Sequence, residues 1–174
     1  DDPVELLKQA EELLAQGNYP EARNYYSQIL SKDSRFPEAL VGQAICFLRE
    51  GLIEKALTDL NEVIQNLTNT MPKAYKHRAL VFSMKGLYQK ALEDINQAFN
   101  LDTQTNIKDK NNYLARAEIY TLLGKPDQAI SDYEMVLILD SENPKVNNNK
   151  AISHRFKHQY DEALIELNLA IKKA

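Results

Sequence analysis

The sequence predicts an all-α protein, a right-handed α-solenoid of ten antiparallel helices arranged as five helix-turn-helix repeats. The first observation is the spacing Ala-x₆-Gly-x₄-Ala, which occurs four times, with a fifth copy that replaces the glycine. The second observation is the distance between the second alanines, which lie 34, 35, 38 and 34 residues apart. A period of this length is typical of stacked helical repeats. The third is apolar residues at i, i+4 and i+7, which mark one face of an α-helix.

Apolar triplets at this spacing predict the first helix of four repeats and the second helix of all five. The first helices carry Leu6-Ala10-Leu13, Leu40-Ala44-Phe47, Tyr75-Ala79-Phe82 and Tyr113-Ala117-Tyr120. The second helices carry Ala22-Tyr26-Ile29, Ala56-Leu60-Val63, Ala91-Ile95-Ala98, Ala129-Tyr133-Val136 and Ala163-Leu167-Ala170. The alanine columns allow two helix backbones to approach closely, because a larger side chain would push them apart. We therefore expect two helices of about thirteen residues in each repeat.

Glycine and proline mark the helix ends. The glycine column lies between the two helices of a repeat, where a residue with positive φ ends a helix at low cost. His158 takes this place in the last repeat. Four prolines lie at the start of a first helix, where the missing N–H does no harm. They are Pro3, Pro37, Pro72 and Pro144. Asp2 and Asn143 precede two of these prolines and are candidate N-caps.

These boundaries predict one domain, 1–174, with repeats at about 3–36, 37–70, 72–105, 110–143 and 144–174. Two of the distances between second alanines exceed 34 residues. We expect the additional residues in the loops at 68–71 and 103–109.

The period, the two alanine columns, the glycine column and the aromatic residues Tyr19, Tyr88 and Tyr160 resemble the tetratricopeptide repeat family. The resemblance covers about residues 3–174. Asn147 departs from it, because the family has an aromatic residue at that place, and the family's closing proline is absent. The resemblance implies that the first helices line a concave groove, in which a peptide or a single helix of a partner lies.

Composition excludes several classes of protein. The net charge of −4 and the pI near 5.5 argue against nucleic acid, because phosphate contacts need a basic surface. No apolar run approaches 18 residues, so we expect no membrane insertion and a cytoplasmic protein. Cys46 is the only cysteine and stands between Ile45 and Phe47, which predicts a small buried hydrophobic residue.

The sequence contains no recognisable catalytic motif. It contains no nucleotide-binding loop, nucleophile elbow or HExxH motif, so we expect no enzyme and no cofactor. His154 and His158 have ligand spacing, but they occupy an apolar column and the glycine column, and we interpret them as structural substitutions and expect no metal. Nine acidic residues are candidate members of carboxylate pairs, and we interpret most of them as solvated helix surface. They are Glu11, Glu12, Asp59, Glu93, Asp94, Asp132, Glu134, Asp161 and Glu162.

The inward face that the resemblance implies carries six cations and three carboxylates over the five repeats. In the last two repeats this face comprises Asn111, Leu114, Ala115, Glu118, Thr121, Leu122, Lys145, Asn148, Asn149, Ile152, Arg155 and Phe156. The excess of positive charge predicts a partner that is acidic or amphipathic. The candidate residues for anionic groups are Lys73, Lys76, His77, Lys145, Asn149 and Arg155. The candidate apolar anchors are Ile45, Leu80, Met84, Leu114 and Ile152.

The preferred hypothesis is a non-catalytic protein-interaction scaffold that binds a peptide or helix of a partner protein in this groove. One alternative is a regulatory or substrate-recognition arm of a larger enzyme or complex. Another is a self-associating assembly module, because the last helix leaves Leu164, Leu167 and Ile171 without a covering helix. We expect that the chain is truncated there, with a homodimer through this uncapped C-terminal end as the alternative.

Overall fold

The computed structural model describes the backbone of residues 2–104, 108–156 and 160–173, and the side chains of these residues except 104, 145, 153–156 and 160–164. The described residues form ten α-helices and one short π-helix, and they contain no strand, which confirms the all-α prediction. They group into two compact units, Asp1–Val81 (unit 1) and Phe82–Ala174 (unit 2). The predicted single domain and the right-handed twist stay predictions.

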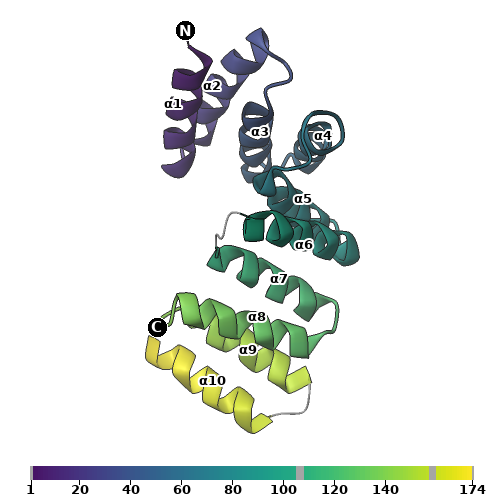
Figure 1. Cartoon of the computed structure of the whole chain (residues 1–174). Coiled ribbons are helices and arrows are strands. Elements are labelled where there is room, and N and C mark those ends of the chain that lie inside the picture. The colour runs from purple at the N-terminus through teal and green to yellow at the C-terminus, as the bar shows by residue number, and fades with distance from the viewer. Residues whose placement is uncertain (1, 105–107, 157–159, 174) are drawn as a thin grey trace. The chain divides into compact units, whose positions relative to one another are not determined.

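Unit 1 contains consecutive helices that pack on their neighbours in the chain (Figure 1). They are α1 (Pro3–Ala15), α2 (Tyr19–Lys32), α3 (Pro37–Arg49), α4 (Ile53–Glu62), η1 (Val63–Leu67) and α5 (Pro72–Met84), whose last three residues belong to unit 2. The first helices of the first two repeats, α1 and α3, also contact each other directly. This is the arrangement expected of stacked helix pairs.

Unit 2 repeats the same arrangement, with each helix packed on the next (Figure 1). Its helices are α6 (Tyr88–Gln104), α7 (Lys110–Leu122), α8 (Pro126–Leu139), α9 (Pro144–Phe156) and α10 (Tyr160–Lys173). The two first helices of this unit, α7 and α9, also contact each other, and α8 packs against both.

The predicted helix ends are confirmed wherever the structure describes them. The four glycines of the column have φ between 71° and 80°, a region that residues with a side chain rarely adopt. Helices α1, α3, α5 and α9 each begin at the predicted proline. The Asp2 carboxylate caps α1 by accepting a hydrogen bond from Val4 N at 3.1 Å. The cap role of Asn143 stays a prediction, and His158 lies outside the described residues.

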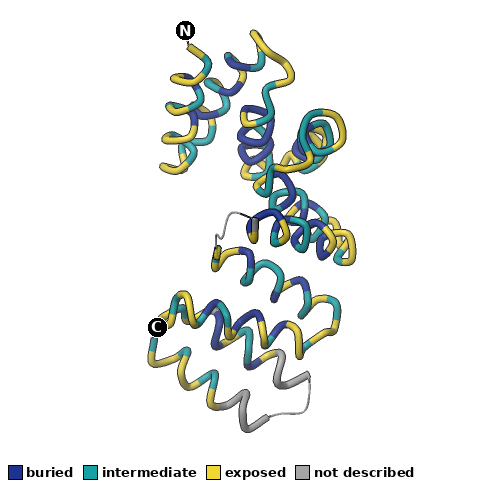
Figure 2. The backbone as a smooth tube through the Cα atoms, in the orientation of Figure 1, coloured by how far each residue is buried: buried dark blue, intermediate teal, exposed yellow. Residues whose placement is uncertain are grey.

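The alanine columns form the centre of the core. All nine of these alanines that the structure describes are at most 2% exposed, which confirms their predicted role. Helix α3 is buried along most of its length (Figure 2), since it packs between α2 and α4. Cys46 lies in this helix, fully buried as predicted, and burial raises the pKa of its thiol to about 11.

The additional residues of the longer repeats lie partly within helices, which corrects the prediction that they lie in loops. Residues 63–67 form the π-helix η1, closed by Thr68 N, which donates to the Val63 carbonyl oxygen at 2.8 Å. A π turn holds one residue more than an α turn, so it absorbs the one-residue excess of this repeat. Likewise α6 extends to Gln104, so part of the second insertion lengthens that helix.

A polar pairing recurs between helices of unit 2. Arg116 on α7 donates to Asp132 on α8 from Nε to Oδ2 at 2.7 Å and from Nη2 to Oδ1 at 2.8 Å. The third guanidinium nitrogen, Nη1, donates to Asn96 Oδ1 on α6 at 3.1 Å. One repeat later, Lys150 and Glu166 hold the corresponding positions, with Nζ 3.0 Å from Oε1. The pairing therefore connects successive helices.

The structure corrects the interpretation of Asp94, Asp132 and Asp59 as solvated surface, while Glu93 and Glu134 are exposed as predicted. Asp94 and Asp132 are only 5% and 4% exposed, because neighbouring helices cover them. Asp59 holds the corresponding position in unit 1, but the neutral Gln43 stands where Arg116 stands in unit 2. Among the described residues, Asp59 Oδ2 is buried without a hydrogen-bond partner. Burial raises the pKa of this carboxyl to about 6.

Candidate binding site

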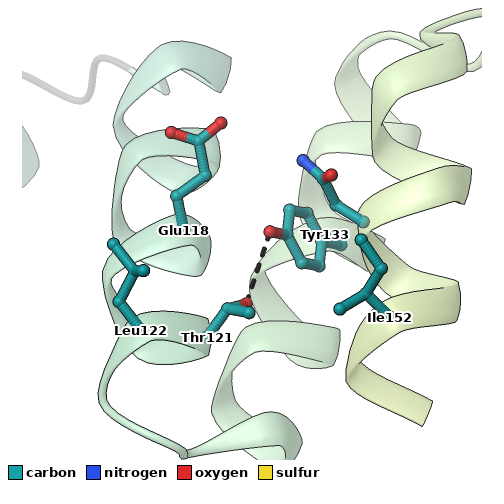
Figure 3. Close-up of a pocket in the computed structure, with 6 residues that line it drawn as sticks. Glu118, Thr121, Leu122, Tyr133 and Ile152 are labelled. Atoms are coloured by element: carbon teal, nitrogen blue, oxygen red, sulfur yellow. Dashed lines mark hydrogen bonds between the residues drawn. The ribbon is translucent and has the colours of Figure 1, made fainter. Parts of the chain in front are cut away.

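Unit 2 contains a pocket of about 320 Å³ between its two first helices. Glu118, Thr121 and Leu122 of α7 form one wall, and Asn149 and Ile152 of α9 form the opposite wall. The ring of Tyr133, from α8, lies between the two walls (Figure 3). Side chains of two first helices and of the second helix between them therefore line the pocket together.

Hydrogen bonds fix the groups at the base of the pocket. Thr121 Oγ1 donates to the carbonyl oxygen of Ala117 at 2.9 Å, which uses its only hydrogen. Tyr133 Oη lies 3.5 Å from the same Oγ1, so in this contact the tyrosine is the donor (Figure 3). The Asn149 side chain also hydrogen-bonds the Tyr133 hydroxyl. Burial, the largest cause, raises the pKa of Tyr133 above 10, so the hydroxyl stays protonated at neutral pH.

The predicted site residues of unit 2 divide into three groups. Asn149 and Ile152 line the pocket together. Met84 is 50% exposed, whereas Leu114 is half-buried and packs against the core of unit 2. Lys145 and Arg155 belong to α9, but their side chains lie outside the described residues.

The predicted site residues of unit 1 lie mainly on α5. Lys73 and Leu80 are exposed, while Lys76 and His77 are half-buried. Ile45, on α3, is only 7% exposed and belongs to the core of unit 1, so it offers a partner little surface. The positive charge of unit 1 and the pocket of unit 2 are therefore two separate candidate features.

The imidazole of His77 is held by its own helix. Nδ1 lies 2.7 Å from the carbonyl oxygen of Lys73, which requires the hydrogen to be on Nδ1. Burial lowers the pKa of His77 below 6.5, and the charges of Lys73, Lys76 and Arg49 lower it further, against the hydrogen bond, which raises it. His77 is therefore a neutral side chain at pH 7, and the positive charge of this face comes from lysine and arginine.

Sequence reasoning did not identify the pocket as such. The sequence places Glu118, Thr121 and Leu122 on the inward face without making them candidate anchors, and it gives Tyr133 only as an apolar residue of a second helix. A signal was present, because aligning the repeats shows tyrosine at the position of Tyr133 in only one other repeat, as Tyr26. In the repeat that follows Tyr26, Gly42 holds the position of Asn149, and the tyrosine ring lies directly against the glycine.

Neither a metal centre nor a membrane segment emerges from the described part of the chain. Its His, Cys, Asp and Glu side chains form no group of three or more that could hold a metal ion. His154 and His158 lie outside the described side chains, so their interpretation stays a prediction. Among the described helices, none is both long enough and apolar enough to cross a membrane.

Helix pairs that stack in register on alanine columns define this chain as an α-helical repeat protein. Models of the tetratricopeptide repeat match residues 7–72 and 111–143. The chain belongs to the tetratricopeptide repeat (TPR) family. A comparison with curated proteins gave no match by sequence.

Solved structures share the fold at low sequence identity. A crystal structure of MamA is 21% identical with a TM-score of 0.78, and covers 94% of this chain and 93% of MamA. TTC0263, a thermophilic TPR protein of Thermus thermophilus, is 23% identical with a TM-score of 0.74, at 99% and 92% coverage. YrrB, described as a TPR protein with an unusual peptide-binding site, is 17% identical with a TM-score of 0.76, at 99% and 86% coverage. These similarities establish the fold.

Proposed function

We propose that this chain is a non-catalytic protein-binding scaffold, which holds a peptide or helix of a partner against the exposed faces of its first helices. One observation carries the proposal. Of the six residues that line the pocket, five lie on the inward face that the family resemblance implies. A pocket of about 320 Å³ is large enough for one long side chain of a bound segment. Anchoring by single side chains is a common mode of peptide recognition.

The charge of α5 supports a second contact. Lys73 is exposed beside the charges of Lys76 and Arg49, and Leu80 is 47% exposed on the same helix. We assign acidic groups of the partner to this face and an apolar contact to Leu80. The printed description of YrrB names a peptide-binding site in a protein of the same fold, which agrees with this proposal.

The proposal is tested with peptides selected from a random library displayed on phage. The affinity of a selected peptide is measured by fluorescence polarisation for the wild type and for Ile152→Asp, which places a charge in the pocket wall. We expect a loss of at least about tenfold, as for a buried anchor position. Ile138→Asp is the matched control, because Ile138 is 73% exposed on α8 and does not line the pocket.

Two results would count against the proposal. One is an equal loss of affinity in Ile152→Asp and Ile138→Asp. The other is a library that yields no peptide enriched on the wild type over Ile152→Asp.

Self-association through α10 is the second candidate function, and a specific observation favours it. Ile165, Leu169 and Ile171 are 60%, 39% and 73% exposed on this helix. Sedimentation velocity over a wide range of protein concentration tests it. A rising sedimentation coefficient that Ile165→Glu abolishes would support the candidate, and a constant monomer coefficient would remove it.

A further inference from the structure

We infer that copies of this chain associate head to tail, with α10 of one copy packed against α1 and α2 of the next. The inference rests on the second candidate function, self-association through α10, and names the surface that receives this helix. It comes from a contact that recurs inside the chain and from two exposed helix faces that correspond to its two sides.

The recurring contact joins a second helix to the first helix that follows it. The residue directly before the first alanine of a repeat contacts the residue five places after the second alanine of the preceding repeat. Pairs of this kind are Arg78 Nη1 with Asn61 Oδ1 at 3.1 Å, Arg116 Nη1 with Asn96 Oδ1 at 3.1 Å, and Lys150 Nζ with Glu134 Oε1 at 3.6 Å. Three places further along the second helix an apolar residue packs on the same first helix, as the Phe99 ring does on Tyr113, with 4.8 Å between ring centroids.

Helix α10 carries the second-helix side of this contact on an exposed face. Among the described elements it packs on α9 alone, and none of its described side chains is buried (Figure 2). Asn168, five places after the second alanine, is exposed. Ile171 is 73% exposed, whereas the residues at its position in the other repeats are half-buried. Those residues are Leu30, Ile64, Phe99 and Leu137.

The first repeat carries the other side of the contact, around a pocket of about 350 Å³ between α1 and α2. This head pocket is lined by Asp2, Glu5, Leu6, Gln9, Tyr25 and Gln28. Gln9 directly precedes the first alanine, so it holds the position of Arg116. Tyr25 holds the position of Asp132, to which Arg116 also donates. The two positions that flank the recurring contact in unit 2 therefore line the head pocket.

The same face of a first helix is covered in the later repeats. Five places before the first alanine, the residues are at most 2% exposed in four repeats, namely Ala39, Ala74, Asn112 and Val146. In α1 this position is the exposed Glu5. Two places after the first alanine, Cys46, Val81 and Ile119 are at most 4% exposed, whereas Glu12 of α1 is exposed. The first repeat therefore presents this face to solvent.

The two faces are complementary in chemistry. With α10 aligned as the preceding second helix, Asn168 meets Gln9 and Ile171 meets the head pocket. Both amides donate and accept, so this pair needs no charge. Because the two helices run antiparallel, the exposed Lys172 at the end of α10 comes close to Glu5 at the start of α1, a pairing of opposite charges.

This contact differs from an isologous dimer of two α10 helices. Because the two faces are unlike, each bound copy keeps one free face, to which a further copy can add. Glu5 and Glu12 stand where later repeats bury uncharged residues, so we expect this contact to be weaker than those within the chain and to be reversible.

Two variants, each blocked at one face, test the inference. Glu5→Lys with Gln28→Lys (the head variant) places two cations at the head pocket, where they repel Lys172. Ile171→Glu (the tail variant) places a charge on the exposed face of α10. Circular dichroism checks that each variant keeps its helical content. Lys172→Glu takes the place of the tail variant if Ile171→Glu unfolds the chain.

Sedimentation velocity over a wide concentration range measures the association of the wild type, of each variant and of their mixture. We expect the wild type to associate, and each blocked variant to stay monomeric to at least about tenfold higher concentration. An equimolar mixture of the two variants should form a dimer and stop there, because one intact tail meets one intact head. Glu93→Lys with Asn100→Lys, exposed on α6, makes the same change in net charge as the head variant and should associate like the wild type.

The possible failures are distinguishable. A wild type that stays monomeric removes both the inference and the second candidate function, and leaves the peptide-binding proposal unaffected. A head variant that associates like the wild type, beside a monomeric tail variant, shows that two α10 helices meet. That result overturns the inference and leaves self-association standing. A mixture that stays monomeric, or a control that loses association as the head variant does, also overturns the inference.

Discussion

Asp59 shows how one substitution in a repeated pattern changes the energetics of a residue. Its counterpart Asp132 accepts two hydrogen bonds from Arg116. Asp59 faces the same position in its own repeat, but the residue there is Gln43, which carries no charge. A carboxylate that is buried without a cation is costly, and its pKa rises because the neutral form is favoured.

Asp59→Asn is expected to stabilise the protein at pH 7. The pKa of Asp59 is about 6 in the folded protein and 3.8 is its ordinary value. The folded state therefore binds the proton more tightly, so the free energy of unfolding falls as the pH rises from about 4 to 6. Asparagine has no charge in this pH range, so the variant does not lose stability in this way. We expect Asp59→Asn to raise the free energy of unfolding by about 1–3 kcal/mol at pH 7 and by close to zero below pH 4. Thermal unfolding followed by circular dichroism at the two pH values measures it.

Asp132→Asn is the matched variant and should act in the opposite direction. It breaks a pair in which Arg116 and Asp132 are both largely buried, which we expect to cost roughly 3 kcal/mol. The stability difference between the wild type and Asp59→Asn should depend on pH. The same difference at pH 4 and at pH 7 would refute the conclusion that Asp59 is a buried carboxylate with a raised pKa.

Between elements, the contact of α2 with α3 depends on Gly42. Glycine inside a helix usually weakens it, so Gly→Ala ordinarily stabilises by up to about 1 kcal/mol. Here the new Cβ would overlap the Tyr26 ring. We therefore expect Gly42→Ala to destabilise unit 1 by about 1–3 kcal/mol, the usual cost of overpacking, measured by urea unfolding.

A second substitution checks the cause of this effect. Unit 2 has two corresponding pairs, Tyr133 with Asn149 and Ile95 with Ala115, and the second combines isoleucine with alanine. The double variant Tyr26→Ile, Gly42→Ala should therefore lose less stability than the sum of the losses in the two single variants. Strict additivity of the two changes would show that the tyrosine ring is not the obstacle.

If η1 accommodates one additional residue, deleting a residue there should change the stability little. Deleting the exposed Gln65 removes the additional residue and restores the spacing of 34. We expect the last turn to become α-helical, with a change in stability of less than about 1 kcal/mol. Deleting the exposed Ser27, in the middle of α2, should cost far more, because it rotates the rest of that helix away from the core. Comparable losses in urea unfolding would contradict this account of η1.

Helix order and helix ends could be predicted from the sequence because each depends on local chemistry. Proline at Pro37 or glycine at Gly51 acts through its own backbone, and the alanine columns repeat often enough to be seen. The π turn and the extension of α6 could not, since they depend on how a helix packs beyond its own sequence. The Arg116 pairing was visible only as a column across repeats, between residues of different helices.

For the molecule as a whole, packing decides which residues of the predicted inward face are accessible. Ile45 is apolar, as an anchor for a partner would be, but it is buried because the helices on either side of α3 cover it. The pocket depends on three helices and on the ring of Tyr133, which no single repeat contains. The family resemblance therefore predicts a face, and packing determines where on that face a side chain can enter.

The distribution of charge predicts a partner contact on unit 1. The double variant Lys73→Glu, Lys76→Glu should bind a selected acidic peptide about tenfold more weakly at low salt. The loss of affinity should be smaller at high salt. Lys32→Glu with Lys55→Glu makes the same change in net charge on the second helices α2 and α4. Equal losses in both double variants, measured by fluorescence polarisation, would show an effect of net charge alone.

The most direct test of the binding face is paramagnetic broadening of methyl signals by a spin label on a selected peptide. We predict strong broadening of Leu122 and Ile152 in the pocket, and little effect on Ile138 of α8, outside the pocket lining. Broadening centred on Ile138, or on Ile165 and Ile171 of α10, would contradict the proposal that partners bind along the first helices.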